Sequence, residues 1–237
     1  MLLRVENLDF FIGSTQILRG VSLGVHEGEI VCLLGRNGAG KSSIIKNIIG
    51  LYSLRAGKIF FQGKEITSCS PREKVLSGIG YSPEDTKIFS ELTVEENINL
   101  STWVTGKGEK GQGFSFEKIF TIFPAIKNFL TRKGLNLSGG EKKMVSIARA
   151  LALDPSLLLL DEAFEGLAPL VVNHFIDALN QIRKLGVTIV LGESNIRIVS
   201  QVTERTYIVE RGEIIFEGHP REILENERLL LLVGKKF

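Results

Sequence analysis

One glycine-rich segment, together with the residues on either side of it, constrains the fold of this chain more than any other feature. Residues 30–34 are all apolar, and residues 42–51 repeat isoleucines at the spacing of one helix face. A continuous apolar run is typical of a strand that is buried on both faces of a parallel sheet. Between this strand and the helix lie Gly35, Arg36, Asn37, Gly38, Ala39, Gly40, Lys41 and Ser42. The order of strand, tight loop and helix predicts an α/β fold.

The residue types in this loop suit a chain of phosphates. Glycines let the backbone curl so that successive N–H groups point inward, and the start of the next helix adds the positive end of its dipole. We expect Lys41 to reach the β- and γ-phosphates of a nucleotide and the Ser42 hydroxyl to ligate Mg²⁺. The full pattern would arise by chance in roughly one such chain in a hundred. The loop therefore predicts nucleotide binding.

Composition limits the other possibilities. A chain of 237 residues, 43% hydrophobic and 24% charged, suits one α/β domain, with or without an inserted subdomain. Its net charge of +2 gives no strong electrostatic attraction for nucleic acid, so we expect no nucleic-acid partner. Cys32 and Cys69 lack metal-like spacing, which favours reduced thiols in the cytosol. We find no signal-peptide pattern, and the apolar runs are too short to span a bilayer, so a membrane role requires a partner.

The middle of the chain is predicted to be mostly helical. A first helix is expected to start over residues 95–100, a second over residues 114–130 with an interruption near Pro124, and a third over residues 141–153. Residues 107–113 form a charged, glycine-rich loop between the first two. Because strand-rich segments precede and follow this stretch, it is interpreted as an insertion.

The last third of the chain returns to alternating strands and helices. Strands are predicted over residues 157–160 and 187–191, with a helix over residues 170–185 between them, an order that favours parallel crossovers. Residues 206–210 and 213–217 are predicted to form a hairpin, and residues 220–232 a closing helix.

Two carboxylates follow the predicted strand at residues 157–160. The carboxyl ends of parallel strands meet at the ligand crevice, so Asp161 is expected to hold Mg²⁺. Glu162 is the candidate general base that polarises the attacking water. An isolated apolar run that ends in two acids would more often be an ordinary solvated strand end. Beside a complete phosphate loop, we prefer the catalytic interpretation.

A second phosphate-seeking surface lies at Leu137, Ser138, Gly139, Gly140 and Glu141, which open a helix. This pentapeptide resembles the signature motif of ABC ATPases. It lies upstream of the acidic pair at the family's usual spacing, and the resemblance covers nearly the whole chain.

The resemblance implies a fold and an assembly. The fold is an α/β P-loop NTPase with a RecA-like parallel-sheet core, an N-terminal antiparallel β subdomain and an inserted helical subdomain. Residues 1–237 would form a single ABC ATPase domain, with residues 1–84 and 155–237 as the core and residues 85–154 as the helical subdomain that docks a transmembrane subunit. The resemblance also implies a head-to-tail dimer with a second ATPase subunit, identical or different. In it Ser138, Gly139 and Gly140 would serve the partner's nucleotide.

The expected site residues follow from the loop and from the resemblance. Residues expected to contact ATP within one chain are Ile12, Asn37, Gly38, Ala39, Gly40, Lys41, Ser42, Ser43 and Asp161. The expected Mg²⁺ ligands are Ser42, Glu84 and Asp161, and the expected catalytic residues are Glu162 and Ser194.

Two details resemble one branch of the family. Glu84 stands where most ABC ATPases carry a glutamine, and residues 166–169 place Ala168 where many relatives have aspartate. Both traits are similar to the ATP-binding subunits of branched-chain amino acid importers and of the related urea and short-chain amide importers. The resemblance implies a peripheral subunit on the cytoplasmic face of the membrane, with permease partners and, indirectly, a substrate-binding protein.

Other details depart from that branch. Ile12 takes the position of an aromatic residue that stacks on adenine, and an aliphatic side chain offers no π-stacking. Ser194 takes the switch position, where most relatives have histidine. It could act there through a bridging water, or it could merely cap the helix that follows. An alternative function is therefore a poorly hydrolysing regulatory subunit paired with a competent one. A DNA-repair or translation ATPase is disfavoured because this chain has one cassette and no basic patch.

Overall fold

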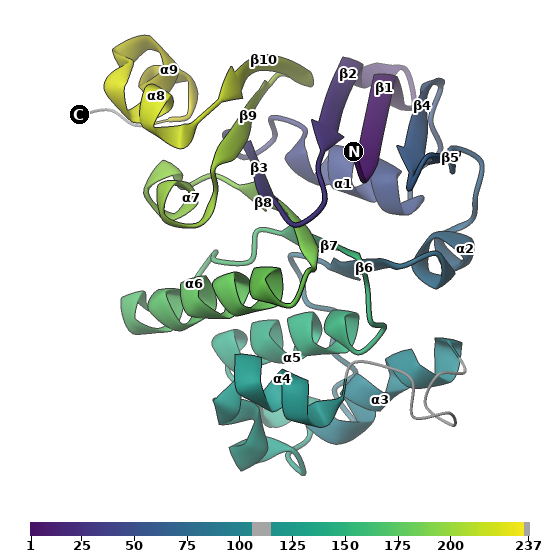
Figure 1. Ribbon diagram of the computed structural model, residues 1–237, viewed down its shortest axis with the longest axis vertical. Helices are drawn as coiled ribbons and strands as arrows, with labels where there is room; N and C mark the ends of the chain where they lie inside the picture. Colours follow the sequence, from purple (N-terminus) through teal and green to yellow (C-terminus); the bar gives the residue numbers. More distant parts are fainter. Residues whose placement is uncertain (106–114, 235–237) are drawn as a thin grey trace.

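The computed structural model describes residues 1–105 and 115–234, arranged around two sheets (Figure 1). The strands are β1 (Leu3–Ile12), β2 (Thr15–Val25), β3 (Ile30–Leu34), β4 (Ala56–Phe61), β5 (Lys64–Glu65), β6 (Ile79–Ser82), β7 (Leu157–Asp161), β8 (Thr188–Glu193), β9 (Arg205–Glu210) and β10 (Glu213–Gly218). The α-helices are α1 (Lys41–Ile49), α2 (Pro71–Leu76), α3 (Val94–Thr105), α4 (Phe116–Ile122), α5 (Gly139–Leu151), α6 (Pro169–Lys184), α7 (Ile196–Val202), α8 (Pro220–Glu225) and α9 (Glu227–Leu232). Two 3₁₀ helices span Pro124–Phe129 and Gly134–Asn136.

The central sheet has the strand order β10-β9-β3-β8-β7-β6. Neighbouring strands from β9 to β6 run parallel, and β10 joins β9 in the predicted antiparallel hairpin. Every residue of β3, β7 and β8 is buried. The predicted α/β fold with a parallel core is therefore confirmed.

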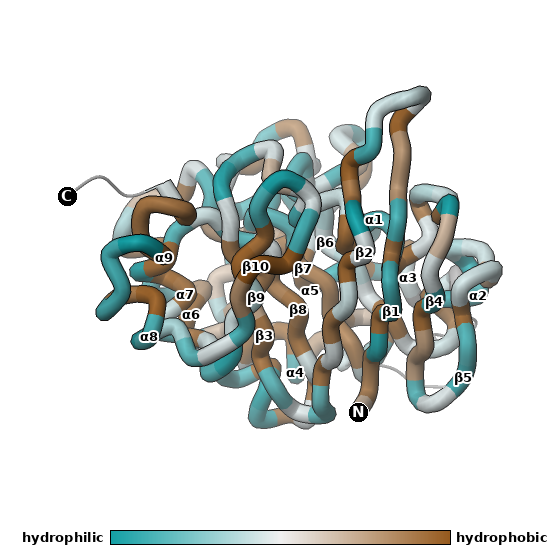
Figure 2. Tube along the Cα trace, turned by 90° about the horizontal axis from the view of Figure 1, so that it is seen from above, coloured by the Kyte–Doolittle hydropathy of each residue, from teal (hydrophilic) through white to brown (hydrophobic). Residues whose placement is uncertain are grey.

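The continuous apolar runs exist because both faces of this sheet are covered. Leu157 and Leu159 of β7 belong to a cluster with Ile44 and Ile45 of α1, whereas Leu158 of β7 belongs to another with residues of α5 and α6. Seen from above, apolar residues concentrate along the central strands (Figure 2). A period-2 alternation in the strand thus directs neighbouring leucines into two cores.

The second sheet is antiparallel, with the order β2-β1-β4-β5. Its buried residues alternate along β1 and β2, as expected for a sheet that covers a core with one face. Leu3, Leu8 and Leu18 from these strands share the cluster that contains α1. The antiparallel sheet therefore packs over the helix that follows the glycine-rich loop, as Figure 1 shows.

Helices α3, α4 and α5 lie together on the far side of the central sheet from β1 and β2 (Figure 1). Ile98, Ile119 and Val145, one from each helix, are buried in one cluster. The predicted interruption near Pro124 is confirmed, because α4 ends before Pro124 and a 3₁₀ helix follows. The loop predicted at residues 107–113 lies outside the described residues. The domain limits at residues 84/85 and 154/155 stay a prediction.

The predicted closing helix over residues 220–232 was wrong in one respect. The structure divides it into α8 and α9 at Asn226, whose backbone is extended (φ −112°, ψ 105°). The Asn226 side chain accepts hydrogen bonds from the N–H groups of Arg228 and Leu229 and so caps α9. The apolar spacing runs through the break because both helices bury residues, such as Ile223 and Leu230, in one small cluster.

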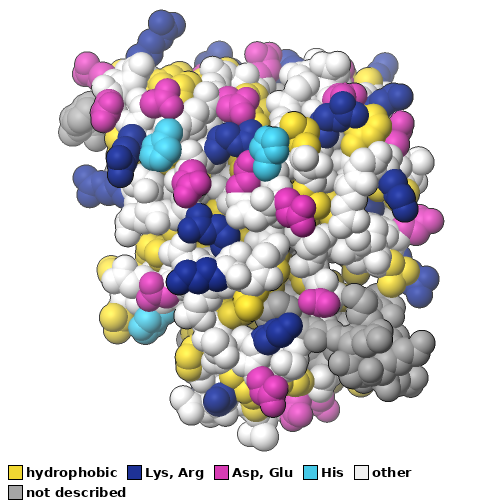
Figure 3. All heavy atoms as spheres, viewed as in Figure 1, with side chains coloured by type: hydrophobic (Ala, Val, Ile, Leu, Met, Phe, Trp, Pro, Cys, Tyr) yellow, Lys and Arg dark blue, Asp and Glu magenta, His cyan; other side chains and the backbone are white. Residues whose placement is uncertain are grey.

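The surface adds two observations. On the face drawn in Figure 3, lysines and arginines are interspersed with aspartates and glutamates. Trp103 of α3 is 71% exposed. None of the helices in the described residues is long and apolar enough to cross a membrane.

Candidate nucleotide-binding site

The loop between β3 and α1 can be built only with glycines at two of its positions. A Cβ atom at Gly35 would lie 2.3 Å from the carbonyl oxygen of Val209. Gly40 has φ +117°, in the left-handed region, and a Cβ there would lie 2.9 Å from the Leu18 side chain. Gly40 is also the N-cap of α1 and supplies no side-chain cap. The loop thus curls tightly at the positive end of a helix, as phosphate binding requires.

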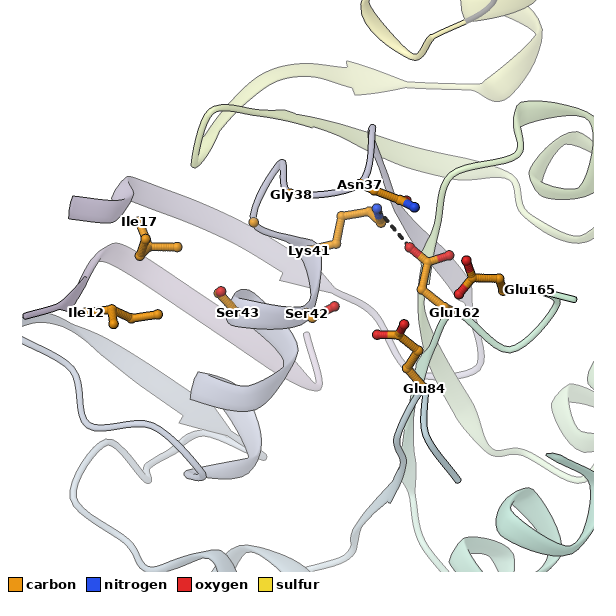
Figure 4. A pocket seen from close by; sticks show the side chains of 11 residues that line it. Ile12, Ile17, Asn37, Gly38, Lys41, Ser42, Ser43, Glu84, Glu162 and Glu165 are labelled. Atoms are coloured by element: carbon orange, nitrogen blue, oxygen red, sulfur yellow. Dashed lines mark ion pairs between the residues drawn. The ribbon is translucent and has the colours of Figure 1, made fainter. Parts of the chain in front are cut away.

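Lys41 directs its ammonium group back over this loop. Only 3% of the residue is exposed. Its Nζ donates to the carbonyl oxygens of Gly35 at 2.9 Å and Arg36 at 3.2 Å. It also forms an ion pair with Glu162 Oε1 at 2.9 Å, drawn as a dashed line in Figure 4. The general-base candidate and the phosphate-binding lysine therefore neutralise each other in this structure.

Ser42 and Asp161 form the second polar pair. Ser42 Oγ donates to Asp161 Oδ1 at 2.8 Å. Asp161 is buried, and burial raises the pKa of its carboxyl group. Within the described residues, Asp161 Oδ2 and Glu162 Oε2 are buried without a hydrogen-bond partner. A serine hydroxyl beside unpaired carboxylate oxygens is a donor set that fits Mg²⁺.

A cavity of about 430 Å³ opens beside these groups (Figure 4). Its size suits a small-molecule ligand. Glu84, Glu162 and Glu165 lie at one end of it, and Ile12 and Ile17 lie at the other (Figure 4). The residues that line it are Ile12, Ile17, Asn37, Gly38, Gly40, Lys41, Ser42, Ser43, Glu84, Glu162 and Glu165. The polar end can hold phosphates and the apolar end can cover a base.

Most of the residues predicted to contact one nucleotide line this cavity. Ala39 and Asp161 are the exceptions. Ala39 is buried and packs beside Gly35, and Asp161 is buried and reaches the cavity through its hydrogen bond from Ser42. Ile12, at the predicted adenine position, lies at the apolar end and is 57% exposed. Glu84 is exposed and points into the polar end.

Glu162 has an unusual backbone that several elements support. Its φ is +48°, which is uncommon for a residue with a side chain. Its N–H donates to the Gly192 carbonyl oxygen of β8 at 2.9 Å. Its own carbonyl oxygen accepts a hydrogen bond from Lys143 Nζ of α5. Together with the ion pair to Lys41, these contacts hold Glu162 from three separate elements.

Glu193, at the end of β8, is a buried carboxylate that sequence reasoning missed. Its Oε1 accepts from the Phe164 N–H at 3.0 Å and its Oε2 from the Ser194 N–H at 3.3 Å. Burial, with a further contribution from the nearby Glu162 charge, raises the pKa of Glu193 to about 7. One available signal was its position, because it ends a continuous apolar run as Asp161 does.

Ser194 itself lies outside the cavity lining and is half-buried. The interpretation of Ser194 as the cap of the following helix was wrong. The cap of α7 is Asn195, whose side chain accepts a hydrogen bond from the Arg197 N–H at 3.1 Å. Asparagine is as good a cap as serine and stands one residue closer to the helix. The switch role of Ser194 stays a prediction.

The second predicted phosphate surface stands apart from this cavity. Ser138 and Glu141 form a reciprocal capping box at the start of α5, with the Ser138 N–H donating to Glu141 Oε2 at 2.8 Å. Ser138 and Gly139 are exposed, and neither they nor Gly140 line the cavity. A Cβ atom at Gly139 would meet nothing within 4 Å. The start of the signature helix is therefore exposed and does not line the chain's own cavity.

Comparison with known proteins decides the family. A family model described as ABC transporter matches residues 18–165. This chain belongs to the ABC transporter ATP-binding family. It is 33% identical over 228 residues to the high-affinity branched-chain amino acid transport ATP-binding protein BraG of Pseudomonas aeruginosa. The matched region covers 96% of this chain and 97% of BraG. It is 34% identical over 238 residues to the lipopolysaccharide export system ATP-binding protein LptB of Escherichia coli K12. That match covers 99% of this chain and 98% of LptB.

Solved structures support the same assignment. The crystal structure of the ADP conformation of MJ1267, an ATP-binding cassette of an ABC transporter, is similar with a TM-score of 0.82 and 27% identity over 99% of both chains. As an ABC ATPase, this chain hydrolyses ATP with Mg²⁺ as cofactor. ABC ATPase cassettes dimerise and work with transmembrane permease subunits.

Four residues near the site were absent from the sequence-based set. Ile17 and Glu165 line the cavity, whereas Lys143 and Glu193 contact the backbone around Glu162 and Phe164. The alternation along residues 15–25 could have suggested Ile17. Nothing local in the sequence pointed to Lys143, because its contact depends on how α5 packs against β7.

Proposed function

We propose that this chain hydrolyses MgATP in the 430 Å³ cavity as one half of a dimer that powers import of branched-chain amino acids or related small amides. The observation that carries the enzymatic part is the group formed by the buried Lys41, Asp161 and Glu162 with the half-buried Ser42. It combines a phosphate-binding cation, a metal-binding pair and a carboxylate base within one site.

Each side chain has a role in this proposal. Ser42 and Asp161 hold Mg²⁺, with Glu84 as a further ligand from the edge of the cavity. When bound, Mg²⁺ neutralises charge on the phosphate oxygens. Lys41 turns from Glu162 to the phosphates, which frees the Glu162 carboxylate to accept a proton from the attacking water. The ion pair at 2.9 Å is thus a resting arrangement that nucleotide replaces.

The exposed start of the signature helix supports a composite site. Gly139 and Gly140 offer main-chain N–H groups at the start of α5, next to the Ser138 cap, but none of these three residues lines the chain's own cavity. In a head-to-tail dimer they would face the phosphates on a second ATPase subunit. The working partner would be a second copy or a related chain.

Complementation tests this arrangement for two copies. Lys41→Ala removes one half of a site and Ser138→Arg the other, so each variant alone is inactive. Mixing them should restore roughly one quarter of the normal ATPase rate, because half of the dimers are mixed and each has one intact site. No recovery on mixing would contradict a site shared between two copies.

The transported substrate is the finer part of the proposal. Glu84 and Ala168 support the branched-chain or amide class, and BraG is a relative with that printed role. LptB, a lipopolysaccharide export protein, is as similar in sequence. Cells that carry Glu162→Gln in this chain should lose ATP-dependent uptake of labelled leucine, valine or a short amide at the cytoplasmic membrane. Unchanged uptake with impaired lipopolysaccharide export would assign the chain to the other class.

A second candidate function follows from two residues. Ile12 offers no aromatic surface at the apolar end of the cavity, and Ser194 lies outside the lining. Both features favour a regulatory subunit that binds ATP and hydrolyses it poorly beside a competent partner. For such a subunit, the purified wild-type chain and its Glu162→Gln variant would turn over ATP equally slowly.

A further inference from the structure

A lysine outside the phosphate loop also reaches the general-base candidate. Lys143 lies in the first turns of α5, shortly after the signature residues. Its Nζ donates a hydrogen bond to the main-chain carbonyl oxygen of Glu162. This carbonyl belongs to the residue with the left-handed backbone, at φ +48°. The contact therefore links the start of the signature helix to the point where β7 turns into the active site.

The surroundings of Lys143 are strongly acidic. Burial lowers the pKa of its ammonium group, and four carboxylates oppose that shift by favouring the charged form. In decreasing order of effect, they are Glu193, Glu165, Glu162 and Glu84. Three of these four carboxylates line the cavity, so Lys143 supplies positive charge next to the acidic end of the cavity.

We propose that Lys143 is a positioning residue for ATP hydrolysis, and that its positive charge keeps the Glu162 carboxylate in a productive place once Lys41 has turned to the phosphates. The inference rests on the proposed role of Glu162 as general base. In the structure two lysines hold Glu162, Lys41 through the side chain and Lys143 through the backbone.

A second cation is needed because several carboxylates lie close together at this end of the cavity. When Lys41 pairs with phosphates, Glu162 loses its 2.9 Å partner and stands beside Glu84 and Glu165 at the same end of the cavity (Figure 4). Like charges in a partly buried site repel and push a flexible carboxylate outward. A fixed ammonium group at the backbone of Glu162 opposes this displacement without competing for the carboxylate's lone pairs.

The origin of Lys143 on α5 gives the contact a second consequence. The same helix carries the capping box of the signature at Ser138 and Glu141. A shift of α5 that alters the signature also moves Lys143 relative to Glu162. The lysine thus couples the phosphate surface offered to a partner to the base in its own chain.

Three substitutions separate charge from hydrogen bonding. Lys143→Arg keeps both, Lys143→Gln keeps a neutral donor on a side chain that is one bond shorter, and Lys143→Met keeps neither. We expect the arginine variant to stay within roughly threefold of the wild-type kcat, and the other two to fall by roughly tenfold or more. The ATP dissociation constant and the thermal midpoint should change little in all three. Lys142→Gln, one residue earlier on α5, removes the same charge as a control and should keep wild-type kcat.

The outcomes are distinguishable from those of the proposed function. Glu162→Gln is measured in the same assay. If Glu162→Gln is inactive and Lys143→Gln turns over ATP at the wild-type rate, the inference about Lys143 is wrong and the role of Glu162 stands. If Glu162→Gln itself turns over normally, the proposed function fails first. Equal losses in Lys143→Gln and Lys142→Gln would also overturn the inference, because they would indicate a general effect of charge on α5.

Discussion

The buried carboxyl group of Glu193 should make the free energy of unfolding depend on pH. The carboxyl group is buried at the end of β8 and accepts two main-chain N–H hydrogen bonds. Burial is the largest cause of its raised pKa, from an ordinary value of 4.5 to about 7. Glu162 raises this pKa further, whereas Lys143 and the two N–H groups lower it. Burial, with a further contribution from the Glu193 charge, also raises the pKa of the Cys32 thiol in β3.

The sign of the effect follows from proton linkage. Between pH 4.5 and about 7, the folded protein holds a proton on Glu193 that the unfolded chain has released. The free energy of unfolding therefore falls as pH rises through this window. From about pH 5 to about pH 8 this one group should cost the wild-type protein about 2.5 kcal/mol.

Urea unfolding of the nucleotide-free protein in EDTA, measured across this pH range, tests the reasoning. Glu193→Gln cannot ionise, so its stability should fall less steeply with pH, by about 2.5 kcal/mol over the range. Glutamine loses one of the two hydrogen bonds, which adds a constant offset and leaves the difference in slope. Glu213→Gln, at an exposed position of β10, should run parallel to wild type. Parallel curves for wild type and Glu193→Gln would refute the raised pKa.

Three further predictions concern the phosphate surfaces and the switch position. Lys41→Ala should abolish or severely weaken ATP binding in equilibrium titrations, and wild-type affinity would contradict the loop assignment. Ser138→Ala removes the capping box of α5 and should lower the free energy of unfolding by about 1 kcal/mol; a change below about 0.3 kcal/mol would show that the cap contributes little. Ser194→His should preserve or raise ATP turnover, and a large loss would indicate that serine is tuned to this site.

Much of the fold could be predicted because its signals are local. Buried parallel strands need continuous apolar runs, and residues 30–34, 157–160 and 187–191 provide them. The glycine-rich loop needs glycine at Gly35 and Gly40 for steric reasons that the structure makes explicit. Such requirements fall on single residues or short windows, so a sequence displays them directly.

Other features depend on which of two residues caps a helix, or on contacts between segments that are far apart in the sequence. The helical spacing of apolar residues continues through Asn226. The asparagine side chain nevertheless ends α8 there, because it caps a new helix, α9. Asn195 outcompetes Ser194 as the cap of α7 by its position. Lys143 and Glu193 reach the site from α5 and β8, which lie 19 and 31 residues from Glu162 along the chain, on opposite sides of it. No periodicity encodes contacts of this kind.

ATP hydrolysis in this cavity depends most on Glu162 as the base that accepts a proton from the attacking water. The most direct measurement is steady-state ATP turnover by the purified chain, with equilibrium ATP binding measured beside it, for wild type and Glu162→Gln. We predict that the variant binds ATP at least as tightly as wild type and loses about a hundredfold or more in kcat. Equal turnover by the two proteins, at equal occupancy by ATP, would show that Glu162 is not the base.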